Sequence, residues 1–304
     1  MMSFRVLVCS LCLASLLALG DIVQADDLKP APAPLRMWHV GNSWSATLPF
    51  EAMGLPRVFY HHTHNFGHNK LEDILTKGWI GEALKKDKAQ KNLLEKGDFD
   101  VVYLGFVQLH SPLPAMDEFF DIVQKHKPGV RIYLQHAWAH GGYKGTHDED
   151  DLDKYDAEWA KRRAAIEAVV DTANKRSGKQ VVFIIPLHDA VMKMRRMVAA
   201  GQFPKVTKQE QLFVSFDGKR DEHGNNQIYA LGAYCAYAAI HGKSPEGMRP
   251  KFPADGNLVG KRDAQVPLDD EQNAVLQKIA WETVSKYPYA GVAAALDPKS
   301  QLAK

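Results

Sequence analysis

Five short apolar runs alternate with segments of helical spacing, and this alternation restricts the fold more than any other feature of the chain. Each run is nearly continuous, as is typical of strands covered by helices on both faces. The runs are Met37–Val40, Arg57–His62, Val101–Val107, Arg131–Trp138 and Gln180–Pro186. A repeated strand–helix–strand order predicts an α/β domain with a parallel sheet. At 304 residues, 45% of them hydrophobic, the chain is long enough to enclose such a sheet in one core.

The segments between and after these runs have the spacing of helices. The predicted helices are Ala46–Met53, Lys70–Lys96, Met116–Lys125, Lys154–Lys175, Ala190–Ala200, Ile228–Ile240 and Asp270–Ser285. Trp38, Trp44, Phe50 and Phe106 are expected in the core.

The first 25 residues have the pattern of an export signal. Arg5 precedes the apolar run Val6–Leu19, and Ala25 completes a signal-peptidase pattern. The run is about 14 residues long, shorter than the roughly 20 that a membrane-spanning helix needs. We therefore expect cleavage after Ala25 and a periplasmic or secreted protein. A linker at 26–35, one domain at 36–290 and a tail at 291–304 would then follow.

Charge and cysteine content exclude several classes of protein. Lys and Arg number 38 against 36 Asp and Glu, a formal charge of +2, and no long basic stretch occurs. Nucleic acid and anionic lipid are therefore not expected partners. Cys9 and Cys12 lie within the signal, which leaves Cys235 alone in the mature chain. An intramolecular disulfide is thus excluded there.

Polar residues follow the first apolar run directly, where ligands bind in open α/β sheets. The segment from Gly41 reads Gly-Asn-Ser-Trp-Ser and contains Ser43 and Ser45. A serine at this turn is a candidate nucleophile, although either serine also suits the cap of the next helix.

A second polar group follows Phe213–Phe216 on a predicted loop. Asp221 lies two residues before His223, and Asp217 precedes both. A carboxylate so close to a histidine can orient the imidazole while its other nitrogen takes a proton from a serine. A solvated surface loop is the alternative interpretation of this segment.

Together these segments resemble the SGNH, or GDSL-type, hydrolases, and more narrowly the secreted members found in planctomycete-like bacteria. Gly41-Asn42-Ser43 resembles the first conserved block, with Asn in place of the commoner Asp. Asp221-Glu222-His223 and the helix that follows resemble the last block. The resemblance covers Arg36 to Pro245 and implies a flavodoxin-like three-layer α/β/α fold with five parallel strands.

The resemblance also implies a mechanism and a site. Ser43 would be the nucleophile, His223 its base and Asp221 the orienting acid, with Asp217 as the alternative acid. The oxyanion would be bound by the N–H groups of Ser43 and Gly67, with Gln108 as a possible third donor. Expected substrate contacts come from Asn42, His68, Trp138 and His188.

Two departures from the family pattern leave the activity open. The third block ends in Gly105-Phe106-Val107-Gln108 and lacks the Asn that donates to the oxyanion, and Asp221 and His223 are separated by one residue instead of two. An exported serine esterase that deacylates a carbohydrate is the leading hypothesis. The alternative is a non-catalytic carbohydrate-binding or interaction protein on the same fold.

A histidine-rich set supports a third hypothesis, a metal-dependent hydrolase. The set consists of His61, His62, His64, His68, His136, His140 and His147. The helical His-x-x-x-His pattern with an adjacent Glu is absent from the sequence, so we expect neither a metal nor another cofactor.

Overall fold

The structure is a computed structural model, and it describes residues 34–41, 43–46, 48–62, 93–107, 113–138, 145–216, 219–250, 252 and 268–292. The predicted signal, most of the linker and the end of the predicted tail lie outside these ranges. Within the described residues, no helix is long and apolar enough to cross a membrane.

Five parallel strands form the central sheet, in the order β2-β1-β3-β4-β5. The strands are β1 (Met37–Gly41), β2 (Arg57–His62), β3 (Val101–Val107), β4 (Arg131–His136) and β5 (Val182–Ile185). The chain leaves β1 for one neighbour, β2, and later returns to its other neighbour, β3. This reversal creates a switch point at the carboxyl ends of β1 and β3, where doubly wound sheets bind their ligands.

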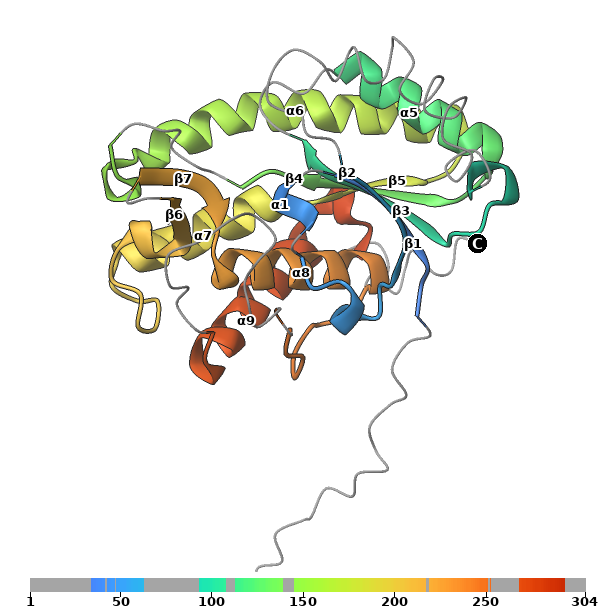
Figure 1. The fold of residues 1–304 in the computed structure, drawn as a ribbon. Helices are drawn as coiled ribbons and strands as arrows, with labels where there is room; N and C mark the ends of the chain where they lie inside the picture. The colour runs from blue at the N-terminus through green and yellow to red at the C-terminus, as the bar shows by residue number, and fades with distance from the viewer. Residues whose placement is uncertain are drawn as a thin grey trace, which may run out of the picture. The chain divides into compact units, whose positions relative to one another are not determined.

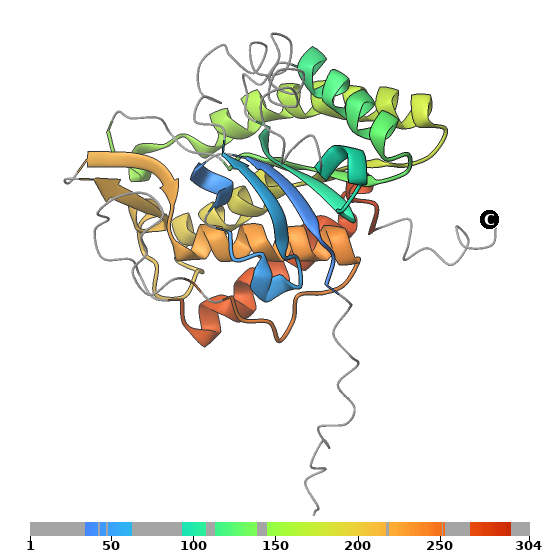
Figure 2. The same cartoon turned by 45° about the vertical axis from the view of Figure 1, so that its right-hand side comes forward.

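Helices cover both faces of the sheet, as Figures 1 and 2 show. The helices are α1 (Ser43–Ala46), α5 (Leu113–His126), α6 (Leu152–Ser177), α7 (Leu187–Ala199), α8 (Asn226–His241) and α9 (Asp270–Lys286). Helices α5 and α6 pack on one face, and α7, α8 and α9 pack on the other (Figure 1). The predicted α/β class, with a parallel sheet between helices, is confirmed.

The sheet separates two hydrophobic cores, one on each face, and alternate side chains of a strand pack into one core or the other. In β3, Val101 and Tyr103 pack on the α7–α9 face, whereas Val102 and Leu104 pack on the α5–α6 face. This is the alternation that strand geometry imposes. Both faces are covered, so the strands read as nearly continuous apolar runs instead of alternating ones.

A separate antiparallel hairpin consists of β6 (Phe213–Phe216) and β7 (Lys219–Gly224). Within the described residues, the short 3-10 helices are η2 (Glu51–Met53), η3 (His147–Glu149), η4 (Gln209–Leu212) and η5 (Pro288–Ala290). The prediction of a loop for Asp221–His223 is therefore wrong, because these residues lie within β7, a strand that pairs with β6. The hairpin leads directly into α8, whose first turn is capped by the Asn225 side chain accepting a hydrogen bond from the Gln227 N–H.

Other element bounds differ modestly from the predictions. The predicted helix Ala46–Met53 is instead two short turns, α1 and η2, and the fourth strand ends at His136, before Trp138. Most of the predicted helix Lys70–Lys96 lies outside the described residues. Trp38, Trp44 and Phe50 are buried, as predicted.

Candidate functional site

Helix α1 begins at Ser43, two residues beyond Gly41, the last residue of β1, and thus lies at the switch point of the sheet. The structure describes the backbone of Ser43 but not its side chain. The neighbouring Trp44 is buried, and its ring stacks on that of Trp138, with centroids 4.7 Å apart and planes at 15°. This stacking joins α1 to the segment that leaves the carboxyl end of β4.

Trp44 and Trp138 also contact β7 of the hairpin, at His223 and Glu222. The Trp44 and His223 rings contact edge to face, with centroids 6.1 Å apart. The indole N–H of Trp138 donates a 2.9 Å hydrogen bond to the carbonyl oxygen of Glu222, next to His223 in β7. The structure therefore brings His223 close to the turn that carries Ser43, although 180 residues of sequence separate them.

A buried contact between a serine and a histidine holds the α1 turn against β1. Ser45 Oγ and His39 Nε2 are 2.8 Å apart, within hydrogen-bond distance, and both side chains are fully buried. His39 belongs to β1, and its ring packs edge-on against Phe50 and Tyr103. Ser45 is thus held inside the domain.

Two glycines make room for Ser45 at the ends of adjacent strands. A Cβ at Gly41 would lie 1.9 Å from Ser45 Oγ, and a Cβ at Gly105 would lie 2.6 Å from the same atom. Neither distance is compatible with a side chain at those positions while Ser45 stays in place. The sequence interpretation missed this arrangement; the signal was one glycine directly after the first apolar run and another near the end of the run Val101–Val107.

The other predicted site residues are described to different extents. Asp221 lies in β7, but its side chain is not described; Asn42, Gly67, His68, Gln108 and Asp217 lie outside the described residues. Their proposed roles stay predictions. Trp138 is 2% exposed and packs inside the domain, so a role in substrate contact also stays a prediction.

His188 lies in the first turn of α7, and its described contacts are with α6. Its ring stacks on Trp159, with centroids 4.5 Å apart, and its Nε2 is 3.8 Å from an oxygen of Asp156. Burial lowers the pKa of His188, although Asp156 acts in the opposite direction. Asp189 instead pairs with Arg163 at 2.9 Å. Adjacent His188 and Asp189 thus have different partners, as expected for neighbours on a helix.

His136 ends β4 on the α5–α6 face and is fully buried against the ring of Trp159. Its pKa is lowered well below the ordinary value, chiefly by burial and also by His188. We therefore expect a neutral imidazole. Among the described residues, no group of three or more His, Cys, Asp or Glu side chains is arranged to hold a metal ion.

No family model, curated protein or solved structure matches this chain. The residues and their geometry alone therefore carry the argument for a function.

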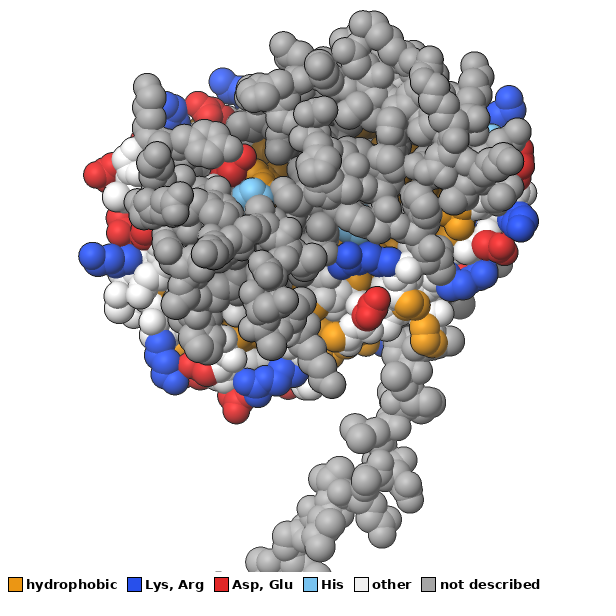
Figure 3. All heavy atoms as spheres, in the orientation of Figure 1, with side chains coloured by type: hydrophobic (Ala, Val, Ile, Leu, Met, Phe, Trp, Pro, Cys, Tyr) orange, Lys and Arg blue, Asp and Glu red, His pale blue; other side chains and the backbone are white. Residues whose placement is uncertain are grey.

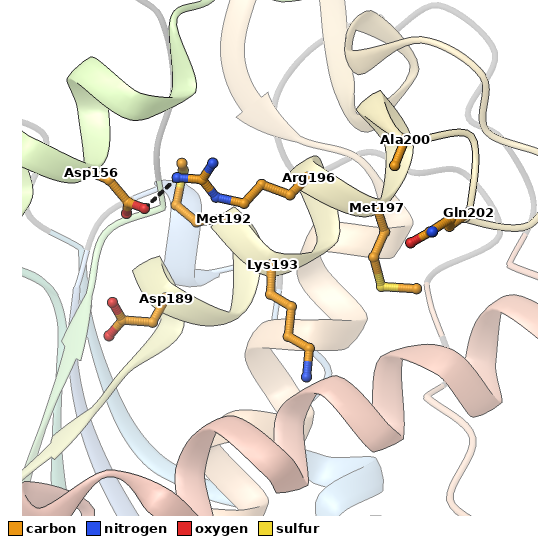
Figure 4. Close-up of a pocket in the computed structure, with 8 residues that line it drawn as sticks. All are labelled: Asp156, Asp189, Met192, Lys193, Arg196, Met197, Ala200 and Gln202. Atoms are coloured by element: carbon orange, nitrogen blue, oxygen red, sulfur yellow. Dashed lines mark hydrogen bonds and ion pairs between the residues drawn. The ribbon is translucent and has the colours of Figure 1, made fainter.

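A pocket of about 470 Å³ lies beside α7, and none of the predicted site residues lines it, although His188 is adjacent (Figure 4). Its lining residues are Asp156, Asp189, Met192, Lys193, Arg196, Met197, Ala200 and Gln202. The charged members already pair with protein groups: Arg196 bonds Asp153 and Asp156, and Lys193 bonds Glu282. Because these charges are satisfied internally, we do not assign the catalytic site to this pocket.

The described surface on the side seen in Figure 3 mixes both signs of charge. Basic and acidic side chains are interspersed around its rim. Of the residues that the structure describes, none contributes to a large patch of one sign on this side.

Replacing Trp138 with phenylalanine tests the connection between α1 and the hairpin. Phenylalanine keeps a ring beside Trp44 but loses the donor to the Glu222 carbonyl. We expect the free energy of unfolding to fall by about 1 kcal/mol more than in the control, as for a lost hydrogen bond. The exciton couplet of the stacked Trp44–Trp138 pair should also disappear from the circular dichroism spectrum.

Trp159→Phe is the matched control. Trp159 is also buried, but its indole N–H has no hydrogen-bond partner within the described part of the chain. Chemical denaturation compares the two variants. Equal losses of stability, with the couplet retained in both, would contradict the assigned role of Trp138.

Proposed function

We propose that the protein is an exported serine esterase of the SGNH type, with Ser43 as nucleophile, His223 as general base and Asp221 as the acid that orients it. A carbohydrate ester is the proposed substrate class, and no cofactor is needed. The observation that carries the proposal is the edge contact between His223 and Trp44, the residue next to Ser43.

Sheet topology supports the same assignment. Ser43 begins the turn after β1, beside the switch point where ligands bind in doubly wound sheets. The order 2-1-3-4-5 is that of flavodoxin-like sheets, in agreement with the fold that the family resemblance implies. Positions 221 and 223 both belong to β7.

The proposed reaction follows from the residue types. His223 takes the proton of the Ser43 hydroxyl as its oxygen attacks the ester carbonyl. Backbone N–H groups of Ser43 and Gly67, with the Gln108 amide, stabilise the oxyanion. His223 then returns the proton to the departing alcohol, and water, activated by the same imidazole, releases the acyl group from Ser43.

Labelling with a fluorophosphonate tests whether Ser43 is an activated nucleophile. We expect the folded mature chain to gain one phosphonyl group, and fragment-ion mass spectrometry to place it on Ser43 instead of Ser45. Ser43→Ala should abolish labelling, because the attacking oxygen is gone. Ser177→Ala, at the end of α6, should label like the wild type.

An unlabelled wild type with a normal unfolding transition would contradict the esterase proposal. That result would favour a binding protein on the same fold.

A further inference from the structure

A fully buried arginine on α7 joins three segments that are distant in sequence. The Nε of Arg195 donates to the side-chain oxygen of Gln209 at 2.9 Å, and its Nη2 donates to Asp150 at 2.8 Å and to the His147 carbonyl at 3.2 Å. Gln209 in turn donates to the Arg195 carbonyl at 2.7 Å. The guanidinium therefore connects α7 with η3 and η4.

From this arginine, a continuous series of contacts leads to the hairpin. Its guanidinium carbon lies 5.2 Å from the ring centre of Phe213, and the His147 ring stacks on the same ring at 3.7 Å. Phe213 begins β6 and pairs with Gly224, the residue after His223. The backbone N–H of Asn225 also donates to the Leu212 carbonyl at 2.9 Å. The strand that carries His223 is thus anchored, at its end, to the Arg195 contacts.

A buried charge is an unusual means of packing a domain. Removing an arginine from water is costly, and well-packed apolar residues often give equal or greater stability. A guanidinium differs from them in donating along fixed directions to several acceptors at once. These contacts suit a residue that determines where the hairpin lies.

We propose that Arg195 is a positioning residue that holds β7 so that the His223 imidazole faces the Ser43 turn. The inference rests on the proposed role of His223 as general base. Arg195 acts through η4 and Phe213 and does not itself contact the reacting atoms.

Arg195→Lys tests the proposal, with Arg196→Lys as the matched control. Arg196 neighbours Arg195 on α7 and bonds two carboxylates, but its side chain is 45% exposed, with no described contact to the hairpin. Lysine retains the charge and loses the fork of donors. On p-nitrophenyl acetate we expect kcat to fall about 100-fold in Arg195→Lys, as for a displaced catalytic group, with KM changed less than about threefold.

A second readout does not depend on turnover. Because the His223 ring lies edge to face with Trp44, we expect the Trp44 ring current to shift the NMR resonance of a His223 ring proton, which is assigned by its loss in His223→Gln. We expect this resonance to move toward the value of an unfolded chain in Arg195→Lys and to stay in place in Arg196→Lys. If Arg195→Lys does not fold, Gln209→Leu, which removes one acceptor, is measured in the same two ways.

The outcomes separate this inference from the proposed function. A folded Arg195→Lys, or Gln209→Leu in its place, with wild-type kcat and an unmoved His223 resonance would overturn the positioning role. A wild type without Ser43-dependent turnover would overturn the esterase proposal and with it the catalytic meaning of the inference. The resonance would then still decide whether Arg195 holds His223 in place.

Discussion

His223→Gln is expected to reduce kcat for p-nitrophenyl acetate about 10⁴-fold or more, as when a base is removed from a serine triad. Glutamine is of similar size but cannot take the proton from Ser43. The half-buried His223 packs against Trp44, so the substitution should leave the fold intact. Steady-state kinetics on the mature chain, with stability measured in parallel, checks the result.

Two further variants make this result specific. Ser43→Ala should lose about as much activity as His223→Gln, and the double variant little more, because the two residues act as one unit. His126→Gln, at the exposed end of α5, is the control and should retain full activity. More than a tenth of wild-type kcat remaining in His223→Gln would reject His223 as the base.

Gly41→Ala is expected to cost about 3 kcal/mol of unfolding free energy, at the upper end of the usual cost of overpacking a core. The new methyl group would lie 1.9 Å from Ser45 Oγ and 2.7 Å from His39 Nε2. Either the α1 turn or β1 must move. The melting temperature should fall by roughly 6–12 °C, measured by calorimetry.

Because α1 carries Ser43, the same substitution should also lower fluorophosphonate labelling. The control is Gly178→Ala, at the end of α6, where φ is +66° and no atom lies within 4 Å of the added Cβ. We expect it to cost about 1 kcal/mol, from backbone conformation alone.

Adding Ser45→Ala to Gly41→Ala should recover part of the lost stability, because the closest atom is then absent. The double variant should therefore lose less than the sum of the two single losses, as expected for residues in contact. Strict additivity would show that Gly41 is not required for the placement of Ser45.

Much of the architecture was predictable because it depends on local pattern. The apolar runs that begin at Met37, Arg57 and Val101 are strands, as predicted. They could be recognised in the sequence because buried parallel strands are apolar on both faces. The position of Ser43 at a strand end followed from the same pattern. Asp221 and His223 were wrongly given to a loop, because β7 reads as polar residues and exists through its pairing with β6.

The α/β class, the approximate strands and helices, and a serine after the first strand could all be predicted from the local pattern of residues. The strand order, the approach of Trp44 to His223, the burial of Ser45 on His39 and the contacts of Arg195 became known from the folded structure alone. The physical reason is distance along the chain: periodicity reports whether a residue is buried, not which side chain, sometimes more than 100 residues away, it meets there.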